Sequence, residues 1–252
     1  MHTTTSAHTI VPREQWQAAQ AALLVREKEH TRLGDELAAQ RRELPWVALE
    51  KPYTLQTTEG PRTLAELFDG RSQLLAYQFM YGPSYRNGCP VNSSIADSFD
   101  ALIPHLRARD VTLIAVSGAP IGELSAYRER MGWRFNWASS YESDFNLDLG
   151  FSKTREQTRQ AIEPILDQLP AVAFRNAEVA GTDIYGYMTE LFGFTAFALD
   201  GVNVYQTYST TGRGVEFLMP YYAFLDRAPA GRAEEQTDWQ LWLRRHDEYE
   251  TE

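Results

Sequence analysis

Apolar positions along the chain form runs of strand length that alternate with helical patterns. Leu74 to Met80 and Val111 to Ser117 are nearly continuous apolar runs, which is typical of parallel strands buried on both faces. A helical pattern follows each run, and Phe135 to Ser139 adds a third short strand. Such alternation predicts parallel strands joined by right-handed crossovers, and therefore an α/β protein.

The segments on either side of this centre predict additions to the sheet. Residues 12–44 are densely charged with loosely spaced leucines, which indicates one long helix, or two if Gly34 breaks it. This helix would pack outside the domain or against a second subunit, so a homodimer is possible. Residues 46–71 read as a hairpin followed by a short helix. Asp200-Gly201 is a strong turn signal between two further strands, at residues 194–199 and 202–208.

Composition and charge argue against several classes of protein. An apolar content of 43% over 252 residues is enough for one sizeable core. A formal charge of −10 argues against nucleic acid as a partner, because polyanion-binding proteins display a basic stripe. No apolar run is long enough for a membrane span, and the first residues lack a signal-peptide pattern. A single cysteine fits a reducing compartment, so we expect a cytoplasmic protein.

The single cysteine lies where thiol chemistry is made easy. Residues 81–88 are a loop with two glycines and a proline, and they connect a predicted strand to Cys89. Pro90 can serve as the first residue of a helix, because that position needs no N–H partner. Cys89 would then occupy the helix N-terminus near Arg86, and both features favour the thiolate over the thiol.

A strand, a loop, a Cys-Pro pair and a helix together resemble the active-site unit of thioredoxin-like proteins. From about Gln15 onward the chain resembles the thioredoxin-like family DUF899. The resemblance implies a thioredoxin-like α/β fold: a central mixed β-sheet flanked by helices, with an N-terminal helix and hairpin as extensions. The matching segments are residues 43–47, 67–74, 79–83, 88–90, 96–97, 108–113, 131–135, 143–146, 205–210 and 242–249.

The chain departs from the family pattern at two places. Typical members resemble Cys-Pro-Ser-Cys, whereas this chain has Cys89-Pro90-Val91-Asn92. With one cysteine, an intramolecular disulfide cycle is excluded. The family's Pro-Gly before a later strand aligns with Phe192-Gly193, and a cis peptide before a residue other than proline costs roughly 2.5–4 kcal/mol. We therefore expect no cis-proline clamp at Leu191-Phe192.

The chain is expected to contain an N-terminal extension and one thioredoxin-like domain, which carries an insertion and a C-terminal tail. Residues 1–45 would form the N-terminal helical extension and residues 46–252 the thioredoxin-like domain. An insertion at about residues 152–192, longer than in typical family members, would supply a lid or pocket wall. The tail, residues 234–252, carries Trp239 and Trp242 and would form a docking helix, with its charged residues paired at the surface.

Three hypotheses of different classes follow. In the first, the protein is a monothiol enzyme: Cys89 attacks a peroxide, a disulfide or an electrophilic carbon, and an external thiol reductant resets it. Arg86 would stabilise the thiolate, and Asn92 would hold developing negative charge.

In the second hypothesis the redox site has become a small-molecule pocket and the cysteine is a bystander. Arg213 is placed there through the family's Tyr-Ser-Thr-x-x-Arg-Gly pattern. The walls of this pocket would be Tyr81, Tyr85, Asn92, Phe192 and Arg213.

The third hypothesis is an interaction domain that uses the N-terminal helix and the aromatic tail.

The sequence suggests no cofactor and no metal. Its glycines lack the spacing of a phosphate-binding loop, and no Gly-x-Ser-x-Gly elbow is present. Glu142, Asp144 and Asp148 lack the alternating ligands of a calcium loop. The expected partners are a small-molecule substrate or an external thiol.

Overall fold

The computed structural model describes residues 8–235 and 239–250, and its contacts divide the chain into the units Met1–Pro45 and Trp46–Glu252. The first unit contains one helix, α1 (Arg13–Glu43). Gly34 does not interrupt this helix, and none of its side chains is buried. Within the described part of the chain, no helix combines the length and apolar character that crossing a membrane requires.

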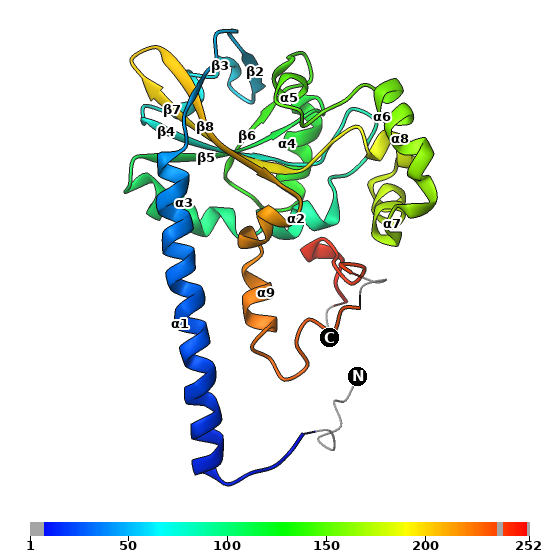
Figure 1. The fold of residues 1–252 in the computed structure, drawn as a ribbon. Coiled ribbons are helices and arrows are strands. Elements are labelled where there is room, and N and C mark those ends of the chain that lie inside the picture. The colour runs from blue at the N-terminus through cyan, green and yellow to red at the C-terminus, as the bar shows by residue number, and fades with distance from the viewer. Residues whose placement is uncertain (1–7, 236–238, 251–252) are drawn as a thin grey trace. The chain divides into compact units, whose positions relative to one another are not determined.

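The second unit is built on one mixed sheet of eight strands (Figure 1). Parallel pairing at its centre joins β4 to β5 and β5 to β6, which confirms the parallel core expected from the apolar runs. On the other side of β4, β7 and then β8 are antiparallel. In spatial order the strands are β1 (Val47–Ala48), β8 (Asn203–Thr211), β7 (Gly193–Asp200), β4 (Gln73–Gln78), β5 (Val111–Ser117), β6 (Asn136–Ser139), β2 (Thr54–Thr57) and β3 (Gly60–Thr63).

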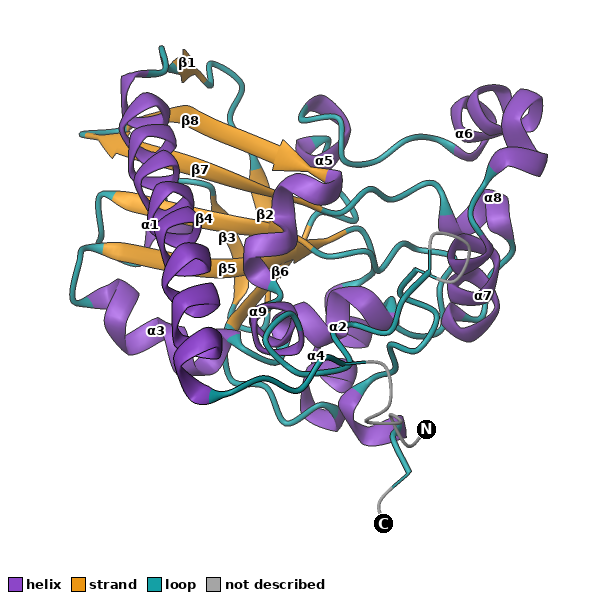
Figure 2. Cartoon of the chain, turned by 60° about the horizontal axis from the view of Figure 1, so that its bottom comes forward, coloured by secondary structure: helices purple, strands orange, loops and turns teal. Residues whose placement is uncertain are grey.

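Helices and turns connect and cover this sheet (Figure 2). The α-helices are α2 (Pro90–Ala96), α3 (Phe99–Arg107), α4 (Ile121–Arg130), α5 (Phe145–Asp148), α6 (Arg155–Ile162), α7 (Ala171–Ala180), α8 (Ile184–Tyr187) and α9 (Pro220–Leu225). The 3-10 turns are η2 (Glu66–Phe68), η3 (Glu163–Gln168), η4 (Gly212–Leu218) and η5 (His246–Glu248).

Two apolar cores form on the sheet. The larger contains residues of α2, α3, α4 and α7, and its centre is an aromatic cluster around Phe79, Trp133 and Trp137. Cys89 belongs to this core. In the smaller core, Leu55 of the β2–β3 hairpin and Phe145 of α5 pack against the sheet. Because each face has its own core, β4 and β5 are buried as the sequence pattern indicated.

Some local predictions hold and others do not. The turn predicted at Asp200-Gly201 joins β7 to β8: Asp200 ends β7, and Gly201, at a φ of 59°, and Val202 form the turn. Pro164 lies where a helical segment is divided, because α6 ends at Ile162 and η3 follows it. Val47–Ala48 was expected in the first hairpin but pairs with β8 instead.

Two expected helices differ from the prediction. The helix after Cys89 is broken at Asp97 and Ser98 into α2 and α3. The docking helix predicted for the tail is absent from residues 239–250, which form turns and η5. This part of the tail has no helical apolar face. The contacts of its buried side chains, Gln240, Leu243 and Arg245, hold it in place.

Candidate thiol site

Cys89 follows the loop after β4 and is the N-cap residue of α2, with Pro90 as the first helical residue. This is the position that the Cys-Pro pair predicts. The Cys89 amide donates to the Met80 carbonyl at 3.1 Å, which ties the loop back to the strand. The cysteine is 1% exposed, so the thiol is inside the protein rather than on its surface.

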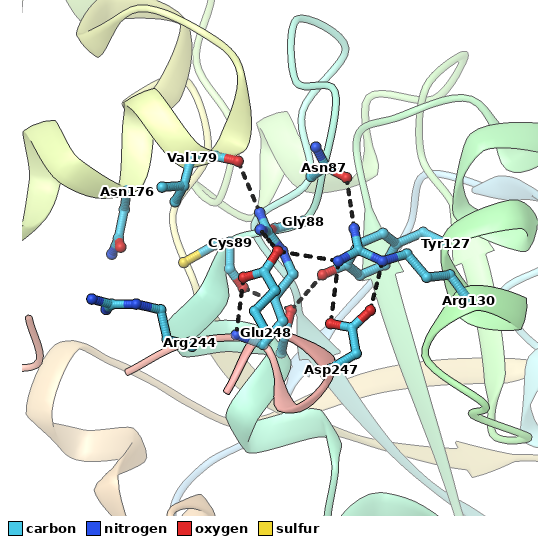
Figure 3. A network of polar contacts seen from close by, with 12 residues as sticks. Asn87, Gly88, Cys89, Tyr127, Arg130, Asn176, Val179, Arg244, Asp247 and Glu248 are labelled. Atoms are coloured by element: carbon cyan, nitrogen blue, oxygen red, sulfur yellow. Dashed lines mark hydrogen bonds and ion pairs between the residues drawn. The ribbon is translucent and has the colours of Figure 1, made fainter. Parts of the chain in front are cut away.

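One hydrogen bond reaches the sulfur, and further polar side chains lie behind it. The Tyr187 hydroxyl donates to Cys89 Sγ at 3.1 Å. The Asn176 side chain lies near the Tyr187 hydroxyl, and Arg175 Nη1 donates to Asn176 Oδ1 at 2.9 Å. Figure 3 shows Cys89 beside a separate network around Arg130 and Glu248, with Asn176 and Arg244 on the side of the sulfur. Tyr187 and Asn176 therefore lie between the thiol and a guanidinium.

Burial has the largest effect on the pKa values of Tyr187 and Arg175. Burial, and then the neighbouring Cys89, raise the pKa of Tyr187 well above its ordinary value. Tyr187 consequently keeps its proton and can donate it in a hydrogen bond. Burial and then Arg244 lower the pKa of Arg175, whereas Cys89 raises it. A guanidinium begins from so high a pKa that it remains a cation at neutral pH.

The C-terminal segment closes one side of the site. Arg245 is 2% exposed and donates to the Gly88 carbonyl through Nε at 3.1 Å and Nη2 at 2.7 Å. The same guanidinium donates to the Val179 carbonyl at 3.0 Å and pairs with Glu248 at 2.6 Å. One side chain of the tail thus joins the cysteine loop to α7.

A second arginine ties the tail to α4. Arg130 pairs with Asp247 at 2.8 Å and with Glu248 at 3.1 Å (Figure 3). It also donates to Asn87 Oδ1 at 3.0 Å, directly before Gly88. The loop that carries the thiol is therefore held from α4, α7 and the tail together.

Gly88 is required by close packing in this loop. A Cβ there would lie 2.7 Å from the ring of Phe79 and 2.9 Å from the ring of Tyr127. Both distances are shorter than real Cβ contacts, and the two rings belong to the aromatic core. The loop approaches the core so closely that only glycine fits beside the cysteine.

The structure gives Asn92 and Arg86 contacts that the sequence did not predict. Asn92 is buried, and its Oδ1 accepts hydrogen bonds from the Tyr77 hydroxyl and the Met80 amide, both at 3.0 Å. This oxygen therefore holds α2 against β4. Arg86 is exposed, and its aliphatic part lies against Gly181. The cations of the hydrogen-bonded network come from later in the chain.

The expected pocket walls are only partly brought together. Tyr81 stacks on Tyr85, and Tyr85 stacks on Tyr187 with ring centroids 5.5 Å apart, so three tyrosines form a row that ends at the thiol. Phe192 packs against the same core, and none of the described peptide bonds is cis. Arg213 is exposed and pairs with Glu216, so its guanidinium is engaged within η4.

Sequence reasoning missed the residues that contact the thiol and cover it. Tyr187 and Asn176 come from the insertion, whose segment carried no motif. Arg245 was assigned to a charged surface, although it lies in the segment 242–249 that resembles the family. Asp144 and Asp148, once considered for a cation site, both pair with Lys51 at 2.7 Å. No cluster of metal-ligating side chains occurs in residues 8–235 and 239–250.

The parallel strands β6, β5 and β4, continued by the antiparallel β7 and β8, and a cysteine at the start of the helix that follows β4 define a thioredoxin-like fold. The chain belongs to the family described as "Bacterial protein of unknown function (DUF899)", whose model matches residues 5–249. Comparison with curated proteins gives no match.

Solved structures similar to this chain include three peroxiredoxins. BcpB, a peroxidoxin of Mycobacterium tuberculosis, shares 11% identity over 70% of this chain and 94% of its own, with a TM-score of 0.42. A mutant of PrxQ from Xylella fastidiosa shares 14% identity over 70% and 90%, with a TM-score of 0.40. A 2-Cys peroxiredoxin of Plasmodium vivax shares 12% identity over 73% and 94%, with a TM-score of 0.40.

Proposed function

We propose that the protein is a cysteine-dependent enzyme in which Cys89 acts as a single thiol nucleophile. The observation that carries this proposal is the hydrogen bond from the Tyr187 hydroxyl to Cys89 Sγ, with Asn176 and the Arg175 guanidinium behind Tyr187. A hydroxyl that donates to sulfur is suited to hold negative charge that develops there during attack, and a nearby guanidinium favours the same charge. A purely structural cysteine needs neither feature.

The sequence has no second cysteine, so external thiols must complete the reaction of Cys89. With a peroxide, the thiolate attacks one oxygen, the O–O bond breaks, and the alcohol or water leaves with a proton while Cys89 becomes a sulfenic acid. An external thiol condenses with it, releasing water and forming a mixed disulfide. A second external thiol then reduces that disulfide, so that two thiols are oxidised for each peroxide reduced. A disulfide or an electrophilic carbon could be attacked by the same thiolate.

Because Cys89 is buried, this activity requires a substrate to gain access to the thiol. At 1% exposure, Cys89 contacts a substrate only when neighbouring side chains move away from it. The same burial favours the second candidate, a small-molecule-binding protein in which the thiol is a bystander. The two candidates differ in whether the native protein's thiol reacts.

The test is alkylation of Cys89 by iodoacetamide near neutral pH, followed by intact mass, in native and urea-unfolded protein. We expect the native thiol to react, and we expect Tyr187→Phe to slow its reaction several-fold because the donor to sulfur is lost. Tyr185→Phe is the matched control, because Tyr185 lies in the same helix under Arg159 and has no contact with the thiol among those described.

Peroxide treatment in the presence of a sulfenic acid trap gives the second readout. The trap should label the native protein, and Cys89→Ser should remain unlabelled. Modification of Cys89 only after unfolding, at every pH from acid to alkaline, would exclude the enzyme and leave the binding protein.

A further inference from the structure

A cavity of about 340 Å³ lies at the carboxyl ends of the parallel strands, and Cys89 is not among its lining residues. Each loop that leaves these strands contributes to it: Ser84 follows β4, Gly118 follows β5 and Ser140 follows β6. Segments next to α6 and α8 complete the wall, and both helices lie beyond this end of the sheet (Figure 1). Open α/β sheets bind ligands at this edge.

A buried carboxyl group lines the cavity. Glu190 is 6% exposed and lies between Gly82 and Gly118, where a Cβ would come within 2.8 Å and 3.1 Å of its side chain. Both loops therefore need glycine to make room for this carboxyl. Ser152 Oγ donates to Glu190 Oε2 at 2.8 Å, and Thr189 Oγ1 contacts Oε1 at 3.4 Å.

This carboxyl group has hydroxyl partners but no cation. No ion pair to Glu190 is found in residues 8–235 and 239–250. Of the two basic residues on the cavity wall, Arg155 pairs with Asp183, and Lys153 is exposed. A buried carboxylate is costly unless a positive charge accompanies it. The protein does not supply that charge.

A second polar group of the cavity wall also lacks a partner. Asn146 is 3% exposed, and its Oδ1 forms no hydrogen bond. Buried amide oxygens are nearly always satisfied, so this oxygen is an exception. Glu190 and Asn146 come from different elements, before β7 and in α5, yet both residues line one cavity.

The remaining wall is apolar on one side. Pro83, Tyr141 and Leu147 line the cavity together with the serines. Its volume is in the range of small-molecule sites, which combine apolar walls with a few polar groups that fix orientation. A ligand that fits needs a positively charged hydrogen-bond donor at one end and an apolar body.

We propose that this cavity binds a small organic amine, whose ammonium group pairs with the Glu190 carboxylate while its apolar body contacts Tyr141 and Leu147. This site is separate from Cys89 and does not depend on the thiol being reactive. The ammonium supplies the missing countercharge.

The experiment is calorimetric titration of the full chain with three amines (methylamine, n-butylamine and benzylamine), each against the alcohol of the same skeleton. We expect at least one amine to bind about tenfold or more tightly than its alcohol, because only the amine pairs with a buried carboxylate. Equal affinity within every pair, or no binding by any amine, overturns the proposal.

Variants locate the site. Glu190→Gln should abolish the preference for amine over alcohol, whereas Glu142→Gln should leave it unchanged, since Glu142 is exposed between two wall residues without lining the cavity. Gly118→Ala retains the carboxylate but places a methyl group 3.1 Å from both of its oxygens, so it should weaken amine binding as well. Thermal unfolding confirms that each variant is folded. Amine preference that survives Glu190→Gln refutes the assignment.

Discussion

The buried carboxyl of Glu190 predicts a pH dependence of stability that one substitution removes. Burial raises the pKa of this group from 4.5 to about 7, and the hydrogen bonds from Ser152 and Thr189 only partly oppose the rise. The folded protein therefore binds this proton more tightly than the unfolded chain. Its stabilising contribution is complete below pH 4.5 and is lost as the pH rises through about 7.

The magnitude follows from the two pKa values. At roughly 1.36 kcal/mol for each pH unit, the interval from 4.5 to about 7 corresponds to about 3 kcal/mol in the free energy of unfolding. Glu190→Gln keeps the shape of the neutral acid and cannot ionise. The variant should match the parent at about pH 4 and exceed its stability by about 3 kcal/mol at about pH 9.

Urea unfolding across this pH range measures the effect. The difference between variant and parent isolates Glu190, because the other titrating groups are common to both proteins. The same wall carries the charged side chains of Lys153 and Arg155, and Arg155 pairs with Asp183. All three residues are retained in the variant. Glu142→Gln serves as the exposed control. A difference between Glu190→Gln and the parent that does not change with pH would refute the reasoning.

Two further substitutions test the packing around Cys89. Arg245→Ala should cost about 2–4 kcal/mol in urea unfolding, because the Gly88 and Val179 carbonyls lose their buried donor. Arg244→Ala is its control, and equal losses would count against the role given to Arg245, since the hydrogen bonds described for the Arg244 side chain go to carbonyls of its own segment. Gly88→Ala should cost about 1–3 kcal/mol by crowding the Phe79 and Tyr127 rings, whereas Gly122→Ala meets open space and should be neutral or stabilising. A neutral Gly88→Ala would show that the rings give way.

The sequence predicted what depends on local pattern. Val111–Ser117 is a strand because its residues are mostly apolar or β-branched and are buried on both faces, and its bounds were predicted without change. Cys89 before Pro90 likewise predicted the start of a helix. These features require only neighbours in the chain, so one sequence is enough to find them.

The contacts of the site were not predictable in the same way. Tyr187 lies 98 residues after Cys89, and nothing in its immediate sequence distinguishes it from the other tyrosines. Arg245 lies among charged residues that usually face water, and only the fold shows that its guanidinium is enclosed. Glu190 offers no signal either, because its burial depends on Gly82 and Gly118, which come from distant loops.

The link between Arg245 and Gly88 also has a consequence for how the chain folds. It closes a loop of 157 residues, so it joins parts of the chain that are distant in sequence. Contacts of such separation form slowly, because the entropy of the whole intervening segment is lost when they close. During refolding, the sheet and α2 can form while the thiol still lacks its cover. Until the tail docks, the loop that carries Cys89 lacks the two hydrogen bonds from Arg245 to Gly88.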